Sequence, residues 1–366
     1  MSTALPRRTA LKIGAAACTA AAVPVGTPFL HAGEKTSSGP VTVGGGDWTY
    51  EWKGDWGELP EGFAWGNVHG VCQAADGTIF ITHQAESGPA RDVILAFDPE
   101  GRFVRSWGKA FHGGGHGLDL REENGEEFLY LTELTTPCTV KYTLQGEEVR
   151  RWTKPEGTDQ YGPDARYMAT NVAFTPDGGF MVGDGYGASH LIKYDAAGEL
   201  VGVFSGGGSD PGRLRCPHGL WWDDRPGRDA ELAVADRSNS RVSYFDQDGT
   251  FLRVEAKGTV PAPCDFAGIA TDADGKTASV CPDLNARVTL LDQDNNVLAH
   301  LGDDADWITK CLANGRAMRK QPDAWVPGRF VAPHDAAFVQ TPGGDGTDLL
   351  VAEWVPSGRL TFLKRV

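Results

Sequence analysis

The chain has 366 residues, 40% of them hydrophobic, and a formal net charge of −15 at pH 7. An acidic surface without a basic stripe repels phosphate backbones and anionic membranes, which excludes nucleic acid as a partner. The 48 glycines and 22 prolines are too many for a helical protein. They stand between apolar runs, as expected for many short strands joined by turns.

Residues 1–32 have the character of an export signal. Arg7 and Arg8 open a stretch without acidic residues, and a weakly apolar, alanine-rich run follows at 13–25. This arrangement resembles a twin-arginine signal peptide. The run is shorter than the roughly 20 apolar residues that span a bilayer, and no later segment is long and apolar enough. We expect export to the periplasm or the cell exterior, without a lipid anchor at Cys18.

Six similar units follow the signal. Each begins with a short apolar run, continues through a turn that is often Asp-Gly, and enters a second apolar run. The six opening runs are 68–71, 115–118, 170–173, 217–220, 267–270 and 333–336. The spacing between units is 47 to 66 residues, and a period of about 40–50 residues is typical of one four-stranded propeller blade. The repeat therefore predicts an all-β, six-bladed β-propeller.

The ring needs a closing strand, because the chain ends on the third strand of unit six. Residues 48–52 near the start are suited to supply the missing outer strand, which would remove an open sheet edge. We therefore expect a linker at 33–46 and a single propeller domain at 47–366. Within the long gap before unit six, residues 306–318 are expected to form a short helix over one face.

The six cysteines that follow the signal show no CxxC spacing, which argues against a cysteine zinc site. Cys264 and Cys281 fall on neighbouring predicted strands of one blade. An exported protein could pair them as a disulfide. Buried free thiols are an equal alternative, and the sequence leaves both open.

The innermost strand of each blade lines the channel, and its anchor residue faces the axis. The six anchors in chain order are His69, His116, Asn171, His218, Gly268 and His334. Units two, four and six each supply a histidine, so three imidazoles converge from directions one third of a turn apart. Such a set can hold Zn²⁺ or another divalent metal and leave one position open.

Other interpretations of the histidines stay open. Each anchor histidine could instead be a polar channel residue bound to water. His69 is a further candidate, either as a fourth ligand or as a hydrogen-bond partner of a ligand. The histidines outside the anchor register are expected in loops or on the surface; these are His83, His112, His190 and His300.

A second motif recurs later in each unit, as in Asp236-Arg237-Ser238-Asn239-Ser240-Arg241. With this motif, residues 63–366 resemble the NHL-repeat family. The stretch 184–239 is similar to the lyase domain of peptidylglycine α-amidating monooxygenase. That domain is a six-bladed propeller with three zinc-bound histidines. It cleaves a peptidyl-α-hydroxyglycine into an amidated peptide and glyoxylate.

The resemblance implies roles for individual residues. The zinc ligands match His116, His218 and His334, the active-site tyrosine matches Tyr186, and one of two substrate arginines matches Arg237. A structural Ca²⁺ would be bound by the backbone carbonyls of Val71 and Leu118 and by Asp335.

Two positions depart from the lyase pattern. Gln84 stands where the second substrate arginine is expected, and an amide offers a substrate carboxylate neither a permanent charge nor a guanidinium fork. Gly187 replaces a half-cystine beside the tyrosine. Of the two substrate-binding candidates, Arg237 would therefore supply the charge for a substrate carboxylate and Gln84 a neutral hydrogen bond.

The resulting hypothesis is a monomeric, metal-dependent lyase that acts on an α-hydroxylated amide, either a small molecule or peptide-like. Tyr186 would act as the base, its pKa lowered by the metal ion and by Arg237. One alternative is a non-catalytic propeller that binds protein or carbohydrate around a structural metal. Another is a propeller hydrolase such as a lactonase.

Overall fold

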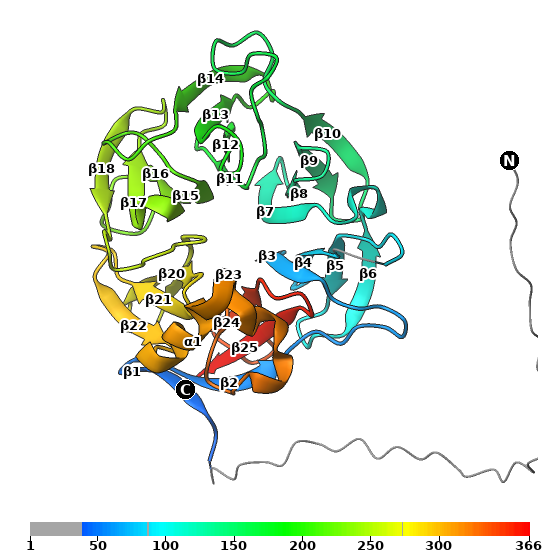
Figure 1. Ribbon diagram of the computed structural model, residues 1–366, viewed down its shortest axis with the longest axis vertical. Coiled ribbons are helices and arrows are strands. Elements are labelled where there is room, and N and C mark those ends of the chain that lie inside the picture. Colours follow the sequence, from blue (N-terminus) through cyan, green and yellow to red (C-terminus); the bar gives the residue numbers. More distant parts are fainter. Residues whose placement is uncertain (1–38, 86–87, 273) are drawn as a thin grey trace, which may run out of the picture. The chain divides into compact units, whose positions relative to one another are not determined.

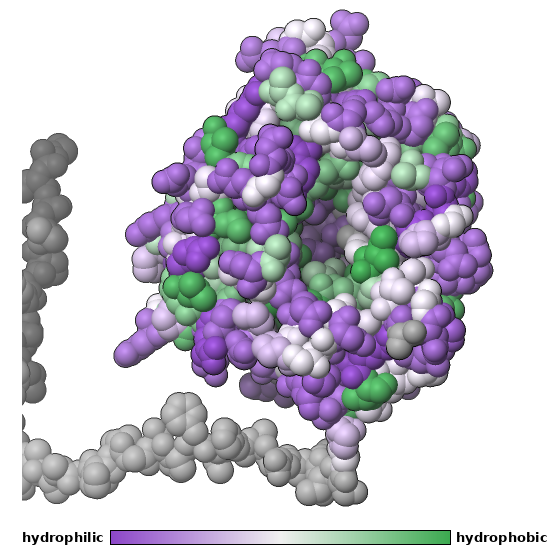
Figure 2. Space-filling view, turned by 180° about the vertical axis from the view of Figure 1, so that it is seen from behind, coloured by the Kyte–Doolittle hydropathy of each residue, from purple (hydrophilic) through white to green (hydrophobic). Residues whose placement is uncertain are grey.

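The chain forms six antiparallel sheets arranged as blades around a central axis (Figure 1). The computed structural model describes residues 39–85, 88–272 and 274–366. The prediction of a six-bladed β-propeller is confirmed. The surface is hollowed at the centre of the ring in the view from behind (Figure 2).

Five blades contain four strands each, which follow one another from the axis outward. Blade one comprises β3 (Asn67–Gln73), β4 (Ile79–Gln84), β5 (Ile94–Phe97) and β6 (Phe103–Trp107). Blade two comprises β7 (Gly115–Glu123), β8 (Glu126–Glu133), β9 (Cys138–Thr143) and β10 (Glu148–Trp152). Blade three comprises β11 (Asn171–Phe174), β12 (Phe180–Gly183), β13 (His190–Tyr194) and β14 (Leu200–Ser205). Blade four comprises β15 (Pro217–Asp223), β16 (Glu231–Asp236), β17 (Arg241–Phe245) and β18 (Phe251–Glu255). Blade five comprises β19 (Ala267–Thr271), β20 (Thr277–Asp283), β21 (Arg287–Leu291) and β22 (Val297–Leu301).

A tight turn joins the first and second strands of blade one, as its Asp-Gly pair predicts. In blade one the Asp76 carboxylate accepts a hydrogen bond from the Thr78 amide at 2.8 Å. Gly77 has a φ of 90°, a left-handed conformation that glycine adopts without steric cost. This local chemistry sets the hairpin and hence the register of the inner strand that faces the axis.

Blade six joins the two ends of the described chain. Its order is β23 (Pro333–Val339), β24 (Asp348–Glu353), β25 (Arg359–Arg365), β2 (Trp48–Asp55) and β1 (Thr42–Gly45). The predicted closure by residues 48–52 is confirmed, because Trp52 pairs with Leu363. Strand β1 lies inside the segment 33–46 expected as a linker, and it adds a fifth strand to this blade.

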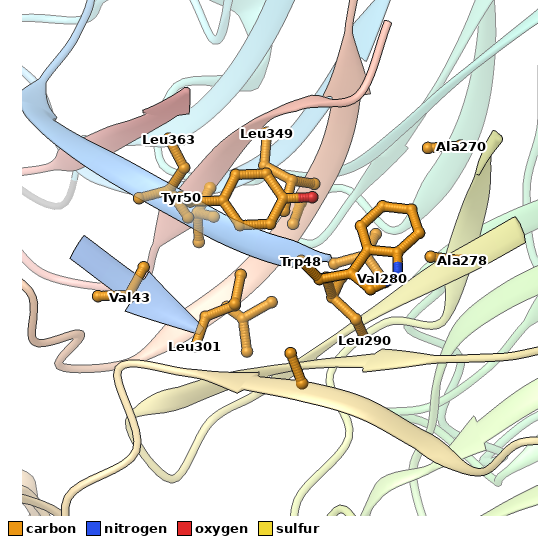
Figure 3. Close-up of a cluster of buried hydrophobic side chains, with 14 of the residues drawn as sticks. Val43, Trp48, Tyr50, Ala270, Ala278, Val280, Leu290, Leu301, Leu349 and Leu363 are labelled. Atoms are coloured by element: carbon orange, nitrogen blue, oxygen red, sulfur yellow. The ribbon is translucent and has the colours of Figure 1, made fainter. Parts of the chain in front are cut away.

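Aromatic side chains of β2 seal the junction of blades five and six (Figure 3). Tyr50 and Trp48 are buried, and they belong to one apolar cluster with Val280 of blade five and Leu349 of blade six. Burying large aromatic surface in this way contributes several kcal/mol to stability, at about 25 cal/mol per Å². The N-terminal strands thus hold the ring closed.

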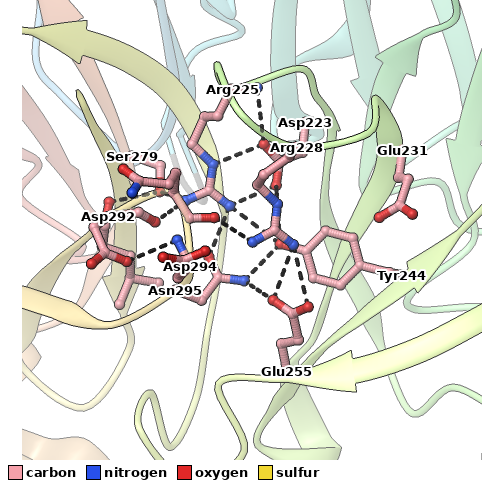
Figure 4. A network of polar contacts seen from close by, with 12 residues as sticks. Asp223, Arg225, Arg228, Glu231, Tyr244, Glu255, Ser279, Asp292, Asp294 and Asn295 are labelled. Carbon is pink, nitrogen blue, oxygen red and sulfur yellow. Dashed lines mark hydrogen bonds and ion pairs between the residues drawn. The ribbon is translucent and has the colours of Figure 1, made fainter. Parts of the chain in front are cut away.

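An arginine without solvent exposure links blades four and five (Figure 4). Arg225 donates to both carboxylate oxygens of Asp223, at 2.8 and 2.6 Å. It also donates to Ser279 of blade five at 3.0 Å and to the side chain of Asn295 at 2.8 Å. A charge in this position is tolerated only because every donor has an acceptor.

The segment before blade six forms the predicted helix. Helix α1 (Ala305–Arg316) is followed by the short 3-10 turns η3 (Ala317–Lys320) and η4 (Pro322–Ala324). Asp304 caps the helix by accepting the Trp307 amide at 2.9 Å. A helix in the expected segment 306–318 is therefore confirmed, but its backbone is non-helical at 313–315, where Asn314 and Gly315 have positive φ.

Two open questions from the sequence have answers in the described residues. All six described cysteines are free thiols, so Cys264 and Cys281 are not bonded to each other. Within the described residues, no helix has the length and apolar character needed to cross a membrane. The expected signal at 1–32 lies outside the described residues.

His83 corrects the expectation of a loop or surface position. It lies on β4 without solvent exposure. Its Nδ1 accepts from the Gly66 amide at 2.8 Å, and its Nε2 lies 2.8 Å from the Asp92 carbonyl. One nitrogen must accept and the other must donate, so the ring is neutral. Burial lowers the pKa of His83 to about 4.

We predict that Arg225→Met lowers the free energy of unfolding by about 3 kcal/mol. The buried Asp223 carboxylate loses both short guanidinium hydrogen bonds and keeps only the Tyr244 hydroxyl at 3.0 Å and Arg228 at 3.5 Å. Urea unfolding measures this loss. Arg102→Met is the matched control, since its ion pair with Asp98 lies at the surface, where such pairs contribute little. Equal losses in the two variants would contradict this structural role of Arg225.

We also predict a pH dependence from His83. Unfolded histidine titrates near 6.5, whereas the folded pKa is about 4, so the unfolded state binds more protons in this window. Relative to His83→Asn, the wild type should lose about 1.4 kcal/mol per pH unit below 6.5 and nothing above it. Urea melts at several pH values test this, and parallel stability curves for the two proteins would refute it.

Candidate metal centre on the propeller axis

Three imidazole rings from alternate blades meet on the axis. His116 lies on β7, His218 on β15 and His334 on β23. The ring centroids are 4.7 to 5.0 Å apart in all three pairs, and each side chain is buried. The structure therefore brings together the three histidines that the sequence singled out, whereas the metal itself stays a prediction.

Backbone carbonyls of the neighbouring blades orient these rings. Each Nδ1 contacts a carbonyl oxygen of the next blade: His116 to Thr170 at 2.8 Å, His218 to Cys264 at 2.6 Å and His334 to His69 at 3.0 Å. A neutral imidazole has one N–H, and these contacts place it on Nδ1. The Nε2 lone pair is then available, which is the arrangement of metal-binding histidines.

The same three contacts identify the axial residues of blades one, three and five. His69 is confirmed as the anchor of blade one. In blade three the anchor is Thr170 and not Asn171, and in blade five it is Cys264 and not Gly268. The repeat pattern therefore predicted the wrong residue for two of the six anchors.

Blade five shows why its anchor was misplaced. In three blades a proline pairs with the acidic residue that ends the second strand: Pro217 with Asp236, Pro333 with Glu353 and Pro263 with Asp283. The residues after these prolines are His218, His334 and Cys264. In blade five this pairing lies outside the named strands, so the apolar run that resembles the repeat begins only at β19.

His69 completes a contiguous ring of imidazoles. Its Nδ1 lies 3.2 Å from Nε2 of His334, and its Nε2 lies 2.8 Å from Oε1 of Gln84. Ligand atoms of His69, His116 and His334 all lie within 4.8 Å of one another. His69 therefore has the position of an additional ligand or of a partner to His334.

Tyr186 and Arg237 lie directly against the histidines. The Tyr186 hydroxyl is 2.8 Å from Nε2 of His218, to which it donates because Nδ1 of that ring carries the proton. Both terminal nitrogens of Arg237 donate to the same hydroxyl at 3.3 Å. The two residues assigned catalytic roles thus form a continuous hydrogen-bonded chain with a candidate ligand.

Buried carboxylates hold the loops that carry this pair. Asp184 accepts hydrogen bonds from the amides of Met168 and Ala188, at 2.7 and 2.6 Å, just beside Tyr186. Asp236 accepts from Arg241 at 2.7 Å. Arg241 therefore fills the structural arginine position of the repeat, and Arg237 is left to face the axis.

Burial sets the charge states at the centre. It lowers the pKa of His116 to about 3 and holds the pKa of His218 and His334 well below 6.5, so all three are neutral near pH 7. Burial also raises the pKa of Tyr186 to about 12. This corrects part of our expectation: Arg237 lowers the pKa of Tyr186, but burial outweighs it when no metal ion contributes.

Gln84 lies beside the ring of axial histidines, but its side chain contacts His69 and does not face an open space. Across the β3–β4 ladder it pairs with Asn67, whose side-chain oxygen accepts from Arg319 at 2.8 Å. Arg319 comes from η3, stacks on Trp354 and adds positive charge near His69. No sequence pattern pointed to Arg319, because only the folded insertion brings it to the axis.

A layer of carboxyl groups lies next to the histidine ring. Asp119, Asp265 and Asp335 line a cavity of about 260 Å³ together with Val71. Asp335 accepts from the Val71 amide at 2.8 Å. Burial raises the pKa of all three carboxyl groups, and repulsion by Asp335 raises those of Asp119 and Asp265 further.

These oxygen donors suit a hard cation such as Ca²⁺. Asp335 is the predicted ligand, and Val71 and Leu118 lie on adjacent inner strands beside it. Asp119 and Asp265 were missed, because a single aspartate in a strand is not informative until the blades are assembled. Calcium stays a prediction for this layer.

The residues present also fit a transition metal at the histidine ring. Nε2 of His116 is buried and has no hydrogen-bond partner among the described residues, an arrangement that is costly unless another group satisfies it. The cavity enclosed by the ring measures about 10 Å³, which is the size of one ion or water. Neutral imidazoles around such a space favour zinc or a similar ion.

We predict one zinc or similar divalent ion per chain in protein purified without added metal, measured by elemental analysis. His116→Ala, His218→Ala and His334→Ala should each lose it. His300→Ala, on the outer strand β22, is the control and should keep it. Removal of the metal should lower the free energy of unfolding by about 3 kcal/mol relative to a hundredfold excess over Kd. Metal retained by all three axial variants would contradict the assignment.

Comparisons with known proteins agree with this fold. Peptidyl-alpha-hydroxyglycine alpha-amidating lyase 1 of Drosophila melanogaster is 31% identical over 176 residues, which cover 45% of this chain and 31% of the fly protein. The peptidyl-glycine alpha-amidating monooxygenase of Mus musculus is 28% identical over 181 residues, 46% of this chain and 18% of the mouse protein. Human NHL repeat-containing protein 3 is 25% identical over 203 residues, 53% of this chain and 55% of that protein.

No protein-family model matches the chain. Among solved structures, virginiamycin B lyase from Staphylococcus aureus superimposes with a TM-score of 0.56 at 11% identity, covering 87% of this chain and 100% of that one. This likeness shows the fold alone. The chain is therefore a six-bladed β-propeller whose homologues include the peptidyl-α-hydroxyglycine amidating lyases and NHL repeat-containing proteins.

Proposed function

We propose that this protein is a metal-dependent lyase that cleaves an α-hydroxylated amide. The observation that carries the proposal is the contact of Tyr186 with both His218 and Arg237. A proton-carrying hydroxyl, a permanent cation and a candidate metal ligand thereby meet at one point on the axis. The partial homology to the amidating lyase supports the same chemistry.

The substrate would bind beside the histidine ring, because the ring itself encloses only about 10 Å³. Arg237 would bind an anionic group of the substrate, such as a carboxylate, through its guanidinium fork. Gln84 would act as a neutral hydrogen-bond partner. Arg319, anchored at Asn67, adds positive charge on the side of Gln84, where an arginine is otherwise expected.

A divalent ion at the histidine ring would polarise the substrate oxygen and lower its proton affinity. His116, His218 and His334 would hold that ion through Nε2. Tyr186 would move the proton: it takes the proton of the substrate hydroxyl and returns it to the departing amide nitrogen. The O–H and C–N bonds break, a C=O and an N–H bond form, and the products are an amide and an aldehyde.

Arg237 has a second role in this scheme. It keeps a positive charge 3.3 Å from the Tyr186 oxygen, which favours the tyrosinate that must be present before Tyr186 can take a proton. Because burial raises the pKa of Tyr186 to about 12 in the absence of metal, we expect the metal-free protein to be inactive.

We predict that purified protein releases glyoxylate from an N-acyl-α-hydroxyglycine, and that a chelator abolishes this release. Tyr186→Phe should lower kcat by about 10²–10⁴-fold. Arg237→Gln should raise KM by about tenfold to a hundredfold, because a charged hydrogen bond is lost. Tyr50→Phe makes the same chemical change as Tyr186→Phe in the outer strand β2 and should leave the rate unchanged.

Absence of metal-dependent glyoxylate from the wild-type protein would overturn the lyase assignment for this substrate class. A non-catalytic binding propeller with a structural metal is the second candidate. The small axial cavity favours it. It predicts full metal content and metal-dependent stability without any product in the same assay.

We also propose that residues 1–32 direct export by the twin-arginine route. The paired arginines and the short alanine-rich run support this. N-terminal sequencing of the protein secreted by its host would test the proposal.

A further inference from the structure

Cys264 occupies the axial position of blade five. Its carbonyl oxygen accepts a hydrogen bond from Nδ1 of His218 at 2.6 Å. The carbonyl oxygen of His69 accepts one from Nδ1 of His334 in the same way, at 3.0 Å. Four of the six axial positions are histidines, and the remaining two are Thr170 and Cys264. A residue with a metal-binding side chain therefore stands at the fifth position, where the repeat pattern predicts Gly268.

The sulfur lies within reach of the same space as the imidazoles. Ligand atoms of His218, Cys264 and His334 all lie within 4.8 Å of one another. A tetrahedral zinc ion with bonds of about 2.0–2.3 Å holds its ligand atoms about 3.3–3.8 Å apart. Side-chain shifts of about 1 Å would bring the three atoms into bonding range.

Burial raises the pKa of the Cys264 thiol to about 11, and Arg237 opposes only part of this rise. The side chain is 0% exposed, and Nη1 of Arg237 is 3.7 Å from the sulfur. Cys281 offers a contrast in the same blade, because its sulfur instead faces the carbonyl oxygen of Asp265 at 3.0 Å. A cation beside Cys264 stabilises a negative sulfur that is otherwise costly to bury.

Cys216 provides an internal comparison. Its sulfur is 3.2 Å from Nη2 of Arg237, so the same guanidinium contacts both thiols. Cys216 nevertheless belongs to neither of the two groups of ligand atoms that lie within 4.8 Å of one another. Contact with Arg237 is thus shared by the two cysteines, while proximity to the imidazoles distinguishes Cys264.

We infer that Cys264 is a thiolate ligand of the axial metal, together with His218 and His334. The site then binds through nitrogen and sulfur, which favours zinc or cobalt(II) over calcium, magnesium or manganese. Binding breaks the S–H bond, forms a metal–sulfur bond and releases the thiol proton to solvent. The inference does not depend on the proposed function, because it applies equally to a structural and a catalytic ion.

Cobalt(II) substitution tests this inference without any activity measurement. The metal is removed from the purified protein with a chelator, and one equivalent of Co²⁺ is added. The wild type should show a thiolate-to-cobalt charge-transfer band in the near ultraviolet as well as visible ligand-field bands. Cys264→Ser should lose the near-ultraviolet band, keep the visible bands and bind zinc more than about tenfold more weakly.

Cys216→Ser is the matched control and should keep both sets of bands. A wild-type cobalt protein without the near-ultraviolet band would overturn the inference, as would retention of that band in Cys264→Ser. If Cys264→Ser does not fold, X-ray absorption at the zinc edge of the wild type decides the question. It should show a sulfur neighbour at about 2.3 Å from the zinc in addition to nitrogen neighbours, and a shell of nitrogen and oxygen alone would refute the inference.

Discussion

The contact between an axial histidine and the backbone carbonyl of the next blade organises the centre of this protein. Nδ1 of His116, His218 and His334 each contacts such a carbonyl at 2.6 to 3.0 Å. The contact fixes which nitrogen is protonated and turns the other toward the axis. It also joins adjacent blades, so the geometry of the candidate metal centre depends on closure of the whole ring by β2 and β1.

Polar side chains on the axis form two layers with different chemistry. Neutral imidazoles and the Cys264 thiol form one layer, and buried carboxyl groups form the other. Soft or borderline ions suit the first layer and hard ions suit the second. Asp335 follows His334 directly in the chain, so a single inner strand contributes to both layers. A change in register of one residue would therefore disturb both sites together.

Sequence patterns predicted the repeat well where it is regular and failed where it is not. The motif Pro-His-Gly-Leu placed His218 correctly, because the proline, the histidine and the following apolar strand are all present. In blade five the strand β19 starts late, and the same reasoning selected Gly268. His83 was expected near the surface because its burial depends on Gly66 and Asp92, which no local pattern connects to it.

The sequence by itself determined the six-bladed architecture, the closing strand, the insertion helix and the set of histidines and Tyr186–Arg237 that face the axis. These follow from apolar periodicity and turn residues, which act over a few neighbouring positions. Only the tertiary structure decided that Cys264, Asp119, Asp265 and Arg319 reach the centre, and that burial raises the pKa of Tyr186. Those properties arise from contacts between blades that are far apart in the chain. A pattern in the linear sequence does not show which residues of different blades lie close together.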